Sequence, residues 1–259
     1  MIPEEAGKLL WESALQGLYY PYALQGRLTM DEAYRVQLAV LERQRAAGEA
    51  QAGWKIGLTA DAVRKHYRSG SPVHGYLLGS GGVASGHAFD AAAATAPSLE
   101  TELCFTLDKD LHGPGVTEAQ VLDAIGAVAP AFEIIERRGD MAADLPLGVA
   151  DNVSQWAYVL GRPVRPYPKA VDLGAVRMEL FRNGQAAAGG VGREVIDHPV
   201  RSLVWLANRL AAFGYWLAAG QIVLTGSFNK PLPAAPGDRW EARFTGLGAA
   251  ACTVACSFA

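Results

Sequence analysis

The segment from which the fold is best inferred is Ser98-Leu-Glu-Thr-Glu-Leu-Cys-Phe-Thr-Leu107, whose residues alternate as in a β-strand. Successive side chains of a strand point to opposite faces, so Glu100 and Glu102 share one face while Leu99 and Leu103 occupy the other. Neighbouring carboxylates repel each other and lose hydration when buried, and a hard divalent cation is the usual compensation. A solvated strand face with two ordinary glutamates is the alternative.

Composition indicates a soluble globular chain. It has 259 residues, of which 50% are hydrophobic, and a net charge of −3. This length allows a substantial core. The mixed charges predict no nucleic-acid partner and no membrane surface. The acidic N-terminus lacks the features of a secretory signal, and no apolar run reaches the roughly 18 residues of a membrane span, so we expect a cytoplasmic protein. Three cysteines have no disulfide or zinc spacing, and a buried apolar role is expected for Cys104, Cys252 and Cys256.

Helix signals are concentrated at the start of the chain. Residues 1–50 form a predicted N-terminal helical segment, in which Thr29 or Asp31 can cap a helix that ends between residues 42 and 48. The main domain is predicted to cover residues 51–259. Residues 69–86 are rich in Gly, Ser and Pro and indicate a loop.

The predicted strands and helices in the rest of the chain do not follow a regular βαβ order. A capping box at Thr117–Gln120 begins a predicted helix that Pro130 stops, and a strand is expected over Ala131–Glu136. Another helix is expected from Pro199 to Gly214. Strands should close the chain over residues 221–225, 239–245 and 251–258. These elements predict a β-rich α+β fold.

Glu133 offers a third carboxylate, because a strand paired beside the first glutamates can bring it next to them. Three carboxylate oxygens would half-fill an octahedron suited to Mg²⁺ or Mn²⁺, with room for a chelating substrate. Glu136 is the competing candidate, but a regular strand places it on the opposite face. An exposed Glu133 at a strand end is the structural alternative.

Lys55 lies in an almost apolar segment flanked by glycines, Gly53-Trp-Lys-Ile-Gly-Leu-Thr59. It is either a lysine that extends its ammonium to the surface or one placed in a pocket, where desolvation suits it to acid–base catalysis. No serine-hydrolase elbow or histidine pair with metal-ligand spacing accompanies it.

Six segments, in order along the chain, resemble one known family, the 2-oxopent-4-enoate hydratase / 4-oxalocrotonate decarboxylase family of the fumarylacetoacetate-hydrolase superfamily. They are Gly53-Trp-Lys-Ile-Gly-Leu-Thr59, Leu99-Glu-Thr-Glu-Leu103, Pro130-Ala-Phe-Glu-Ile134, Ala150-Asp-Asn-Val-Ser154, Asp197-His-Pro199 with Val204-Trp-Leu-Ala-Asn208, and Gly220-Gln-Ile-Val-Leu-Thr-Gly-Ser227. The resemblance implies a mixed sheet or roll with packed helices, and a catalytic domain over residues 51–259.

The resemblance also implies a lyase that acts on 2-hydroxy-dienoates from the meta-cleavage of aromatic compounds. Its Mg²⁺ or Mn²⁺ would be bound by Glu100, Glu102 and Glu133, the trio that the carboxylate argument reaches independently. By the same resemblance, Lys55 is an acid–base or carboxylate-binding group. The residues implied to line the substrate pocket are Ser154, Ser227 and Lys230.

Two lyase activities fit this resemblance, and the sequence divides between them. The segment Gly226–Pro233, with Lys230, is similar to the hydratases. In Ser71-Pro-Val-His-Gly-Tyr76, however, many hydratases have an acidic residue at the position of Val73 and a Tyr or Phe at that of His74, and Val73 is more similar to the decarboxylases. A hydratase without that acid needs another proton-transfer group, either His74 or a water on the metal. We favour hydration of a 2-oxo-4-enoate, with decarboxylation of a 2-oxo-3-enedioate as the alternative.

Two other classes of function are less favoured. A C–C hydrolase similar to fumarylacetoacetate hydrolase would need a catalytic His–Glu pair that the sequence does not show. A non-enzymatic scaffold would not need Lys55 and all three glutamates. The resemblance further implies a homo-oligomer built from dimers.

Overall fold

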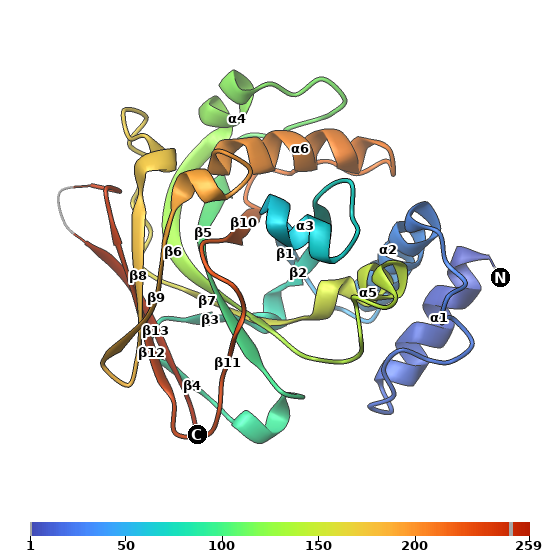
Figure 1. Cartoon of the computed structure of the whole chain (residues 1–259). Helices are drawn as coiled ribbons and strands as arrows, with labels where there is room; N and C mark the ends of the chain where they lie inside the picture. Colours follow the sequence, from blue (N-terminus) through green and yellow to red (C-terminus); the bar gives the residue numbers. More distant parts are fainter. Residues whose placement is uncertain (1, 249–250) are drawn as a thin grey trace.

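The computed structural model describes residues 2–248 and 251–259, which form two β-sheets with helices packed around them (Figure 1). The α-helices in these ranges are α1 (Pro3–Ala14), α2 (Met30–Ala46), α3 (Asp61–His66), α4 (Glu118–Ala124), α5 (Leu145–Ala150) and α6 (Pro199–Ala211). None of them has the length and hydropathy needed to cross a membrane. The predicted α+β class is confirmed, as is a helical N-terminal segment. The division at residue 50 stays a prediction.

The larger sheet contains β1–β3 and β5–β7 from the first part of the chain, together with β10 and β11 from its last part. Its order is β2-β1-β10-β5-β6-β7-β3, and β11 pairs with the end of β5. The strands are β1 (Gln51–Gly57), β2 (Val73–Leu78), β3 (Gly82–Ala84), β5 (Ser98–Leu107), β6 (Ile125–Ile135), β7 (Gln155–Leu160), β10 (Ile222–Ser227) and β11 (Leu232–Pro233). Thus β10, from the end of the chain, separates β1 from β5.

The smaller sheet packs against β6 and β7 through β12 and β13. Its order is β4-β13-β12-β8-β9. The strands are β4 (His87–Phe89), β8 (Arg177–Arg182), β9 (Gln185–Val191), β12 (Arg239–Thr245) and β13 (Cys252–Phe258). Cys104 and Cys256 are buried as predicted, while Cys252 is half-buried.

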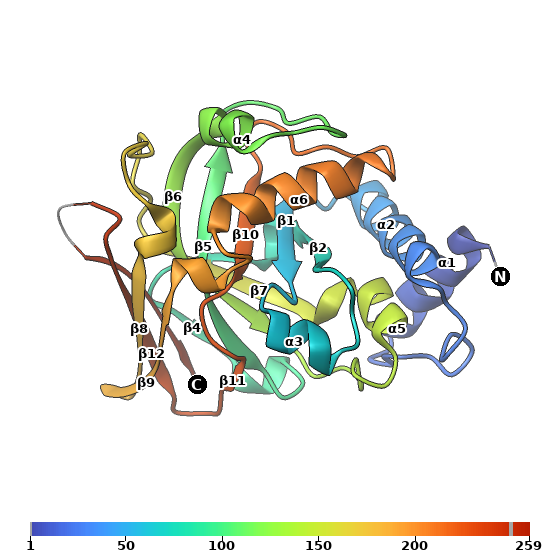
Figure 2. The ribbon, with the colours of Figure 1, turned by 45° about the horizontal axis from the view of Figure 1, so that its top comes forward.

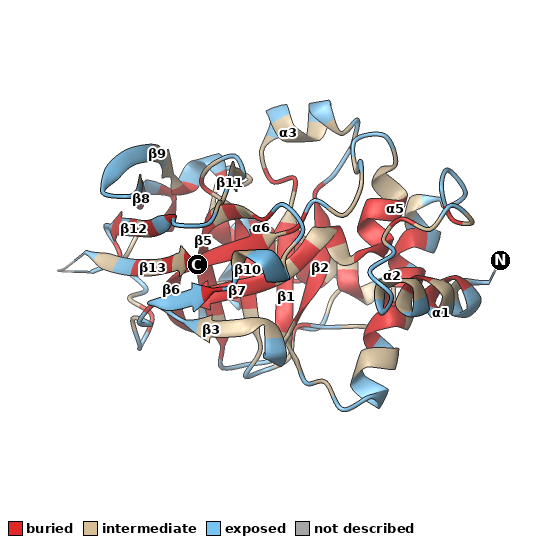
Figure 3. Cartoon of the chain, turned by 90° about the horizontal axis from the view of Figure 1, so that it is seen from below, coloured by how far each residue is buried: buried red, intermediate tan, exposed pale blue. Residues whose placement is uncertain are grey.

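Helices cover the larger sheet from two sides. In Figure 2, α6 lies across it against β10 and α4, while α1, α2 and α5 form a group at the end of the molecule that holds the N-terminus. Figure 3 shows that β1, β2, β5, β7 and β10 of the larger sheet are buried along most of their length, whereas β3 is only half-buried and α3 projects with no buried residue. The N-cap of α2 is Thr29, whose side chain forms a capping box with Glu32.

Two sequence expectations were wrong about local structure. The helix after Thr117 ends at Ala124, and β6 begins at Ile125 rather than Ala131. Ten of the eleven residues of β6 are buried, so its apolar residues do not alternate with polar ones. Without that alternation, the start of the strand was mistaken for a continuation of the helix. Residues 69–86, expected to be a loop, contain β2 and β3 because tertiary pairing with β1 and β7 overrides their Gly and Pro content.

Register brings the glutamates together. Glu100 pairs directly with Glu133 across the antiparallel β5 and β6 strands, and Glu102 pairs with Ala131. Directly paired residues of antiparallel strands point to the same face, so all three glutamates project from one side of the sheet.

His74 lies on the other side of the sheet from Lys55. Lys55 pairs with Gly75 of β2, and His74, one residue earlier, points the opposite way. The imidazole stacks on Tyr34 at 4.3 Å between ring centroids and meets Trp54 edge-on. Both ring nitrogens are buried and have no hydrogen-bond partner among the residues that the structure describes. Burial lowers the pKa of His74 to about 3, and the Arg209 guanidinium adds to the effect.

We expect Gly53→Ala to destabilise the fold. A Cβ at Gly53 would overlap the carbonyl of Ile222, its partner in the parallel β1–β10 pair. Overpacking of this kind costs about 1–3 kcal/mol or more in the free energy of unfolding. The matched control is Gly79→Ala, where the nearest atom is 3.5 Å from the added Cβ. Equal thermal stabilities of the two variants would contradict this.

A second prediction concerns acid stability. The unfolded state binds a proton at His74 below its ordinary pKa of 6.5, whereas the folded state does so only near pH 3. Stability is therefore lost as the pH falls from 6.5 toward 3, by about 1.4 kcal/mol per pH unit from this one group. His74→Phe should remove that contribution, and denaturant unfolding between pH 6.5 and 4 measures it. Identical slopes in wild type and variant would refute the assignment.

Candidate metal centre

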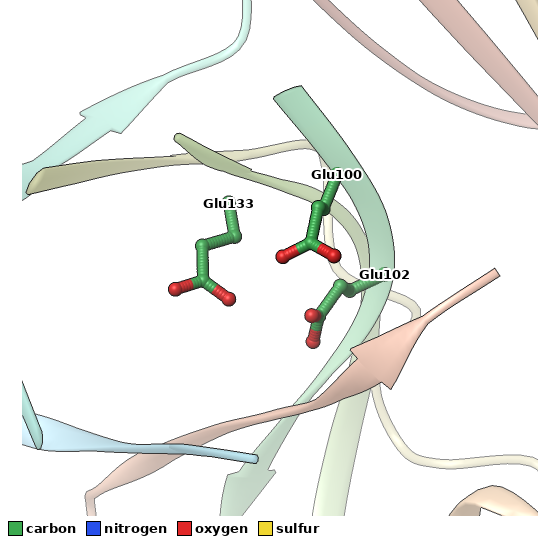
Figure 4. A group of neighbouring side chains, drawn as sticks. All are labelled: Glu100, Glu102 and Glu133. Atoms are coloured by element: carbon green, nitrogen blue, oxygen red, sulfur yellow. The ribbon is translucent and has the colours of Figure 1, made fainter. Parts of the chain in front are cut away.

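Three carboxylates meet on one face of the larger sheet. Glu100 and Glu102 project from β5 and Glu133 from β6, and Figure 4 shows their carboxylates turned toward a common space. One oxygen from each lies within 4.8 Å of the other two. Glu102 and Glu133 are each 1% exposed, and Glu100 is half-buried. The surface-residue alternative therefore does not describe Glu102 or Glu133.

This arrangement opposes the ionised form of the carboxylates. Burial raises the pKa of Glu100 to about 8, with repulsion from Glu133 adding to the effect and the Lys55 ammonium opposing it. Burial, followed by repulsion from Glu133 and Glu100, raises the pKa of Glu102 well above its ordinary value. A cation between the three groups would relieve both effects.

Lys55 provides part of the compensating charge. Its side chain comes from β1 and is 2% exposed, and Nζ lies 2.8 Å from Glu133 Oε1. Nζ also donates a hydrogen bond to the Val153 carbonyl at 3.1 Å. If all three carboxylates are ionised, Lys55 balances one of them and two negative charges remain. The donor set, which consists of oxygens only, and the residual charge of two both fit a hard divalent ion.

A strained turn holds the carbonyl that Lys55 contacts. Asn152, Val153 and Ser154 have φ values of 56°, 52° and 60°, all in the left-handed region. Asparagine tolerates this region, but a β-branched residue such as Val153 is strained in it. Strain of this kind persists where surrounding contacts fix it, commonly at functional sites.

The side chain of Asn152 fastens this turn to β2. Its Oδ1 accepts from the Tyr76 backbone N–H at 2.8 Å, and its Nδ2 donates to the Tyr76 carbonyl at 3.0 Å. Gly75 leaves the space that this packing needs, because a Cβ there would lie 3.0 Å from Lys55 Cε and 2.7 Å from Asn152 Oδ1. Sequence reasoning missed this function of Asn152 and Gly75; the only signal was the motif Ala150–Ser154.

Gly226 positions Glu102 from the neighbouring strand. Its backbone N–H donates to Glu102 Oε2 at 2.7 Å. Its φ is 111°, and a Cβ there would overlap the side chain of Thr59, so both conformation and space require glycine. This contact was also missed, because it depends on the pairing of β10 with β5.

The three residues expected to line a substrate pocket lie in different settings, and only Ser227 is paired with a residue of the cluster. Ser227 is paired with Glu102, and its hydroxyl donates to the Asn229 carbonyl at 2.6 Å. Ser154 ends the left-handed turn and is half-buried. Lys230 is exposed, three residues beyond Ser227.

Three other residues clarify the sequence alternatives. Glu136 is outside the carboxylate group; it pairs with Arg138 at 2.8 Å and accepts from the Thr95 N–H at 2.8 Å. His74 is not brought to the cluster. Val73 is fully buried on the same face as Lys55, since Val73 and Gly75 alternate with His74 along β2.

Known proteins are similar to this chain in sequence and in fold. The family model for the fumarylacetoacetate (FAA) hydrolase C-terminal region matches residues 60–255. A 2-hydroxyhexa-2,4-dienoate hydratase of Comamonas testosteroni is 39% identical over 224 residues, which cover 85% of this chain and 84% of the hydratase. A 4-oxalocrotonate decarboxylase of Pseudomonas sp. (strain CF600) is 33% identical over 89% of this chain and 86% of its own.

A solved structure of 4-oxalocrotonate decarboxylase from Pseudomonas putida G7, complexed with magnesium and adipate, superposes with a TM-score of 0.91 at 30% identity. The match covers 99% of this chain and 97% of that one. Because the family model matches most of this chain, the chain belongs to the fumarylacetoacetate hydrolase family.

Proposed function

We propose that this protein is a divalent-metal-dependent lyase that adds water to a 2-hydroxy-2,4-dienoate, by way of its 2-oxo-enoate form, to give a 4-hydroxy-2-oxo acid. The observation that carries the proposal is the buried group of Glu100, Glu102 and Glu133 with Lys55 as a paired cation. The 39% sequence identity to the Comamonas hydratase supports hydration, which we place in the degradation of aromatic compounds.

The metal in this proposal is Mg²⁺ or Mn²⁺, bound by Glu100, Glu102 and Glu133. The magnesium in the related decarboxylase structure supports a divalent ion. Bound there, the ion would polarise the 2-oxo acid group of the substrate and stabilise the negative charge that develops on its 2-oxygen. Gly226 holds Glu102 in place by its N–H, which fixes one carboxylate oxygen before the substrate arrives.

Lys55 is the proposed acid–base or carboxylate-binding residue. Hydration requires that a proton pass from the 2-hydroxyl to the carbon chain and that water deliver its hydroxyl to C4 and its proton to carbon. Lys55 Nζ can hold or release a proton beside the substrate, because it lies against the carboxylate cluster and is shielded from solvent. Ser154, Ser227 and Lys230 are proposed to line the pocket. His74 is left out, since it faces the opposite side of the sheet.

Decarboxylation of a 2-oxo-3-enedioate is the second candidate. Val73 favours it, because an apolar, fully buried side chain stands on the Lys55 face where many hydratases are expected to have an acid. A protein with no carboxylate there has one group fewer for proton transfer to the diene. The similarity to the Pseudomonas decarboxylases supports the same reading.

Product analysis tests the two activities directly. The purified protein with Mg²⁺ would be given 2-hydroxypenta-2,4-dienoate and 2-oxohex-3-enedioate in separate reactions. We expect a 4-hydroxy-2-oxo acid from the first and no release of CO₂. Release of CO₂ from the second, with no hydration of the first, would replace the hydratase by the decarboxylase. Inactivity toward both with bound metal would reject both candidates.

Metal binding should depend on the proposed carboxylate ligands. Glu102→Gln removes a charge and a ligand, so we expect calorimetry with Mg²⁺ or Mn²⁺, with and without oxalate as a substrate mimic, to show loss of binding and of turnover. The matched control is Glu136→Gln, which alters a buried glutamate outside the cluster. Circular dichroism should first confirm that both variants fold. Normal metal affinity in Glu102→Gln would place the metal site elsewhere.

Replacement of the buried lysine tests its chemical function. Lys55→Ala should lower kcat by at least ~10², the scale of a lost general acid or base. The control is Lys65→Ala, which removes an exposed lysine on α3 and should keep wild-type turnover. A loss in Lys55→Ala of only a few-fold, in a folded and metal-bound protein, would show that Lys55 has no acid–base function.

We further infer a cytoplasmic homo-oligomer built from dimers. The resemblance of the six motifs to the family supports this assembly, and light scattering of the purified protein measures it.

A further inference from the structure

The left-handed turn at residues 152–154 is held at both ends by one arginine. Arg138 Nη1 donates to the Asp151 carbonyl at 3.4 Å, and Arg138 Nη2 donates to the Gln155 carbonyl. These two carbonyls belong to the residues directly before and directly after the turn. One guanidinium therefore joins the ends of the segment whose middle carbonyl accepts a hydrogen bond from Lys55.

Two acidic side chains fix the guanidinium in this position. Arg138 Nε donates to Glu136 Oε2 at 2.8 Å, and Nη1 lies 3.4 Å from Asp151 Oδ2. All three side chains are largely buried, with that of the arginine 12% exposed. The centroid of the Tyr19 ring, from the loop after α1, lies 5.2 Å from Arg138 Cζ. Solvent screens such a buried group little, so its charge pairs restrain the guanidinium more than surface pairs would.

Glu136 attaches the same turn to the strands that carry the proposed metal ligands. Its N–H donates to the Ser154 carbonyl at 3.0 Å, and its Oε1 accepts from the Thr95 N–H at 2.8 Å. Glu136 directly follows β6, the strand of Glu133, and Thr95 lies just before β5, which begins at Ser98. The turn is thereby tied to the ends of β5 and β6.

The turn needs this restraint because its backbone is strained. A β-branched residue is disfavoured in the left-handed region, and such conformations persist only where the surrounding structure over-determines them. Asn152 ties the first residue of the turn to Tyr76 of β2. Arg138 and Glu136 hold its two ends and its last carbonyl. Without them we expect the turn to relax and the Val153 carbonyl to move away from the ammonium.

We propose that Arg138 is a positioning residue for Lys55: by bridging the carbonyls on either side of the turn, it keeps the Val153 carbonyl against the ammonium. Two acceptors, that carbonyl and Glu133 Oε1, define the direction in which Nζ points, whereas one acceptor would let it swing. The inference rests on the proposed function, because the position of Lys55 matters for turnover only if Lys55 takes part in the reaction.

Hydrogen–deuterium exchange tests the bridge without reference to activity. Arg138→Lys keeps the positive charge of the buried pairs, but an ammonium cannot span two carbonyls as the forked guanidinium does. We expect amide exchange over residues 151–155 to be at least about tenfold faster than in the wild type, and exchange in β12 to be unchanged. The control, Arg182→Lys, alters an arginine that pairs with Asp238 at 2.7 Å in the smaller sheet, and should leave the turn unaffected. Wild-type exchange at the turn in Arg138→Lys would overturn the proposal.

A double-mutant cycle shows whether Arg138 acts through Lys55. In the active enzyme, Arg138→Lys should lower kcat at least about tenfold, because small displacements of a catalytic group have effects of this size. In the Lys55→Ala background the same substitution should lower the remaining kcat by less than about twofold, because effects that pass through one residue are not additive. Calorimetry with Mg²⁺ and oxalate should show that Arg138→Lys binds both normally.

The outcomes separate this proposal from the proposed function. Equal fold-losses of kcat in the two backgrounds would mean that Arg138 only supports the fold, and would overturn the positioning role. An unchanged kcat in Arg138→Lys, with Lys55→Ala at least ~10² slower than the wild type, would overturn it as well. The proposed function fails differently: a loss of only a few-fold in Lys55→Ala removes its acid–base role, and exchange at the turn then decides whether Arg138 holds the turn.

Discussion

The ion pair between Lys55 and Glu133 is buried on one face of the larger sheet, and the backbone around it both contacts the lysine and leaves space for it. Removing either partner would leave a buried charge without its counterion, which is among the most destabilising changes a core can undergo. The lysine donates a hydrogen bond to the Val153 carbonyl, and Gly75 leaves the space that its side chain needs. The left-handed turn at residues 152–154 is therefore a condition for keeping an ammonium group in the core.

The two faces of β1 and β2 lie in different chemical environments. One face of β1 and β2 carries Lys55 and borders the carboxylates; the other carries Trp54 and His74 and borders the aromatic residues of α2 and α6. Because neighbouring residues in sequence point to opposite faces, Val73 and His74 belong to different environments. A motif that places them side by side in sequence says nothing of this separation.

Sequence reasoning succeeded where the pattern is local. The alternation of β5 is a property of ten consecutive residues, so the shared face of Glu100 and Glu102 followed from period two alone. The inclusion of Glu133 needed only that β6 pair with β5. What could not be predicted depends on pairing between distant segments: the N–H of Gly226 on Glu102, the strand at residues 73–78, and the burial of His74 among aromatic rings. The early start of β6 was hidden because burial on both faces removes the alternation that identifies a strand.

The insertion of β10 between β1 and β5 also constrains the order of events during synthesis. Until residues 222–227 have left the ribosome, the edges of β1 and β5 have no strand to join them, and Glu102 lacks its backbone donor. The nascent chain carries all three glutamates long before it can arrange them. An interrupted translation product would thus retain every acidic residue of the cluster and still lack the strand that joins β1 to β5. We therefore expect Lys55 to reach the carboxylates only in a chain that has been synthesised past Ser227.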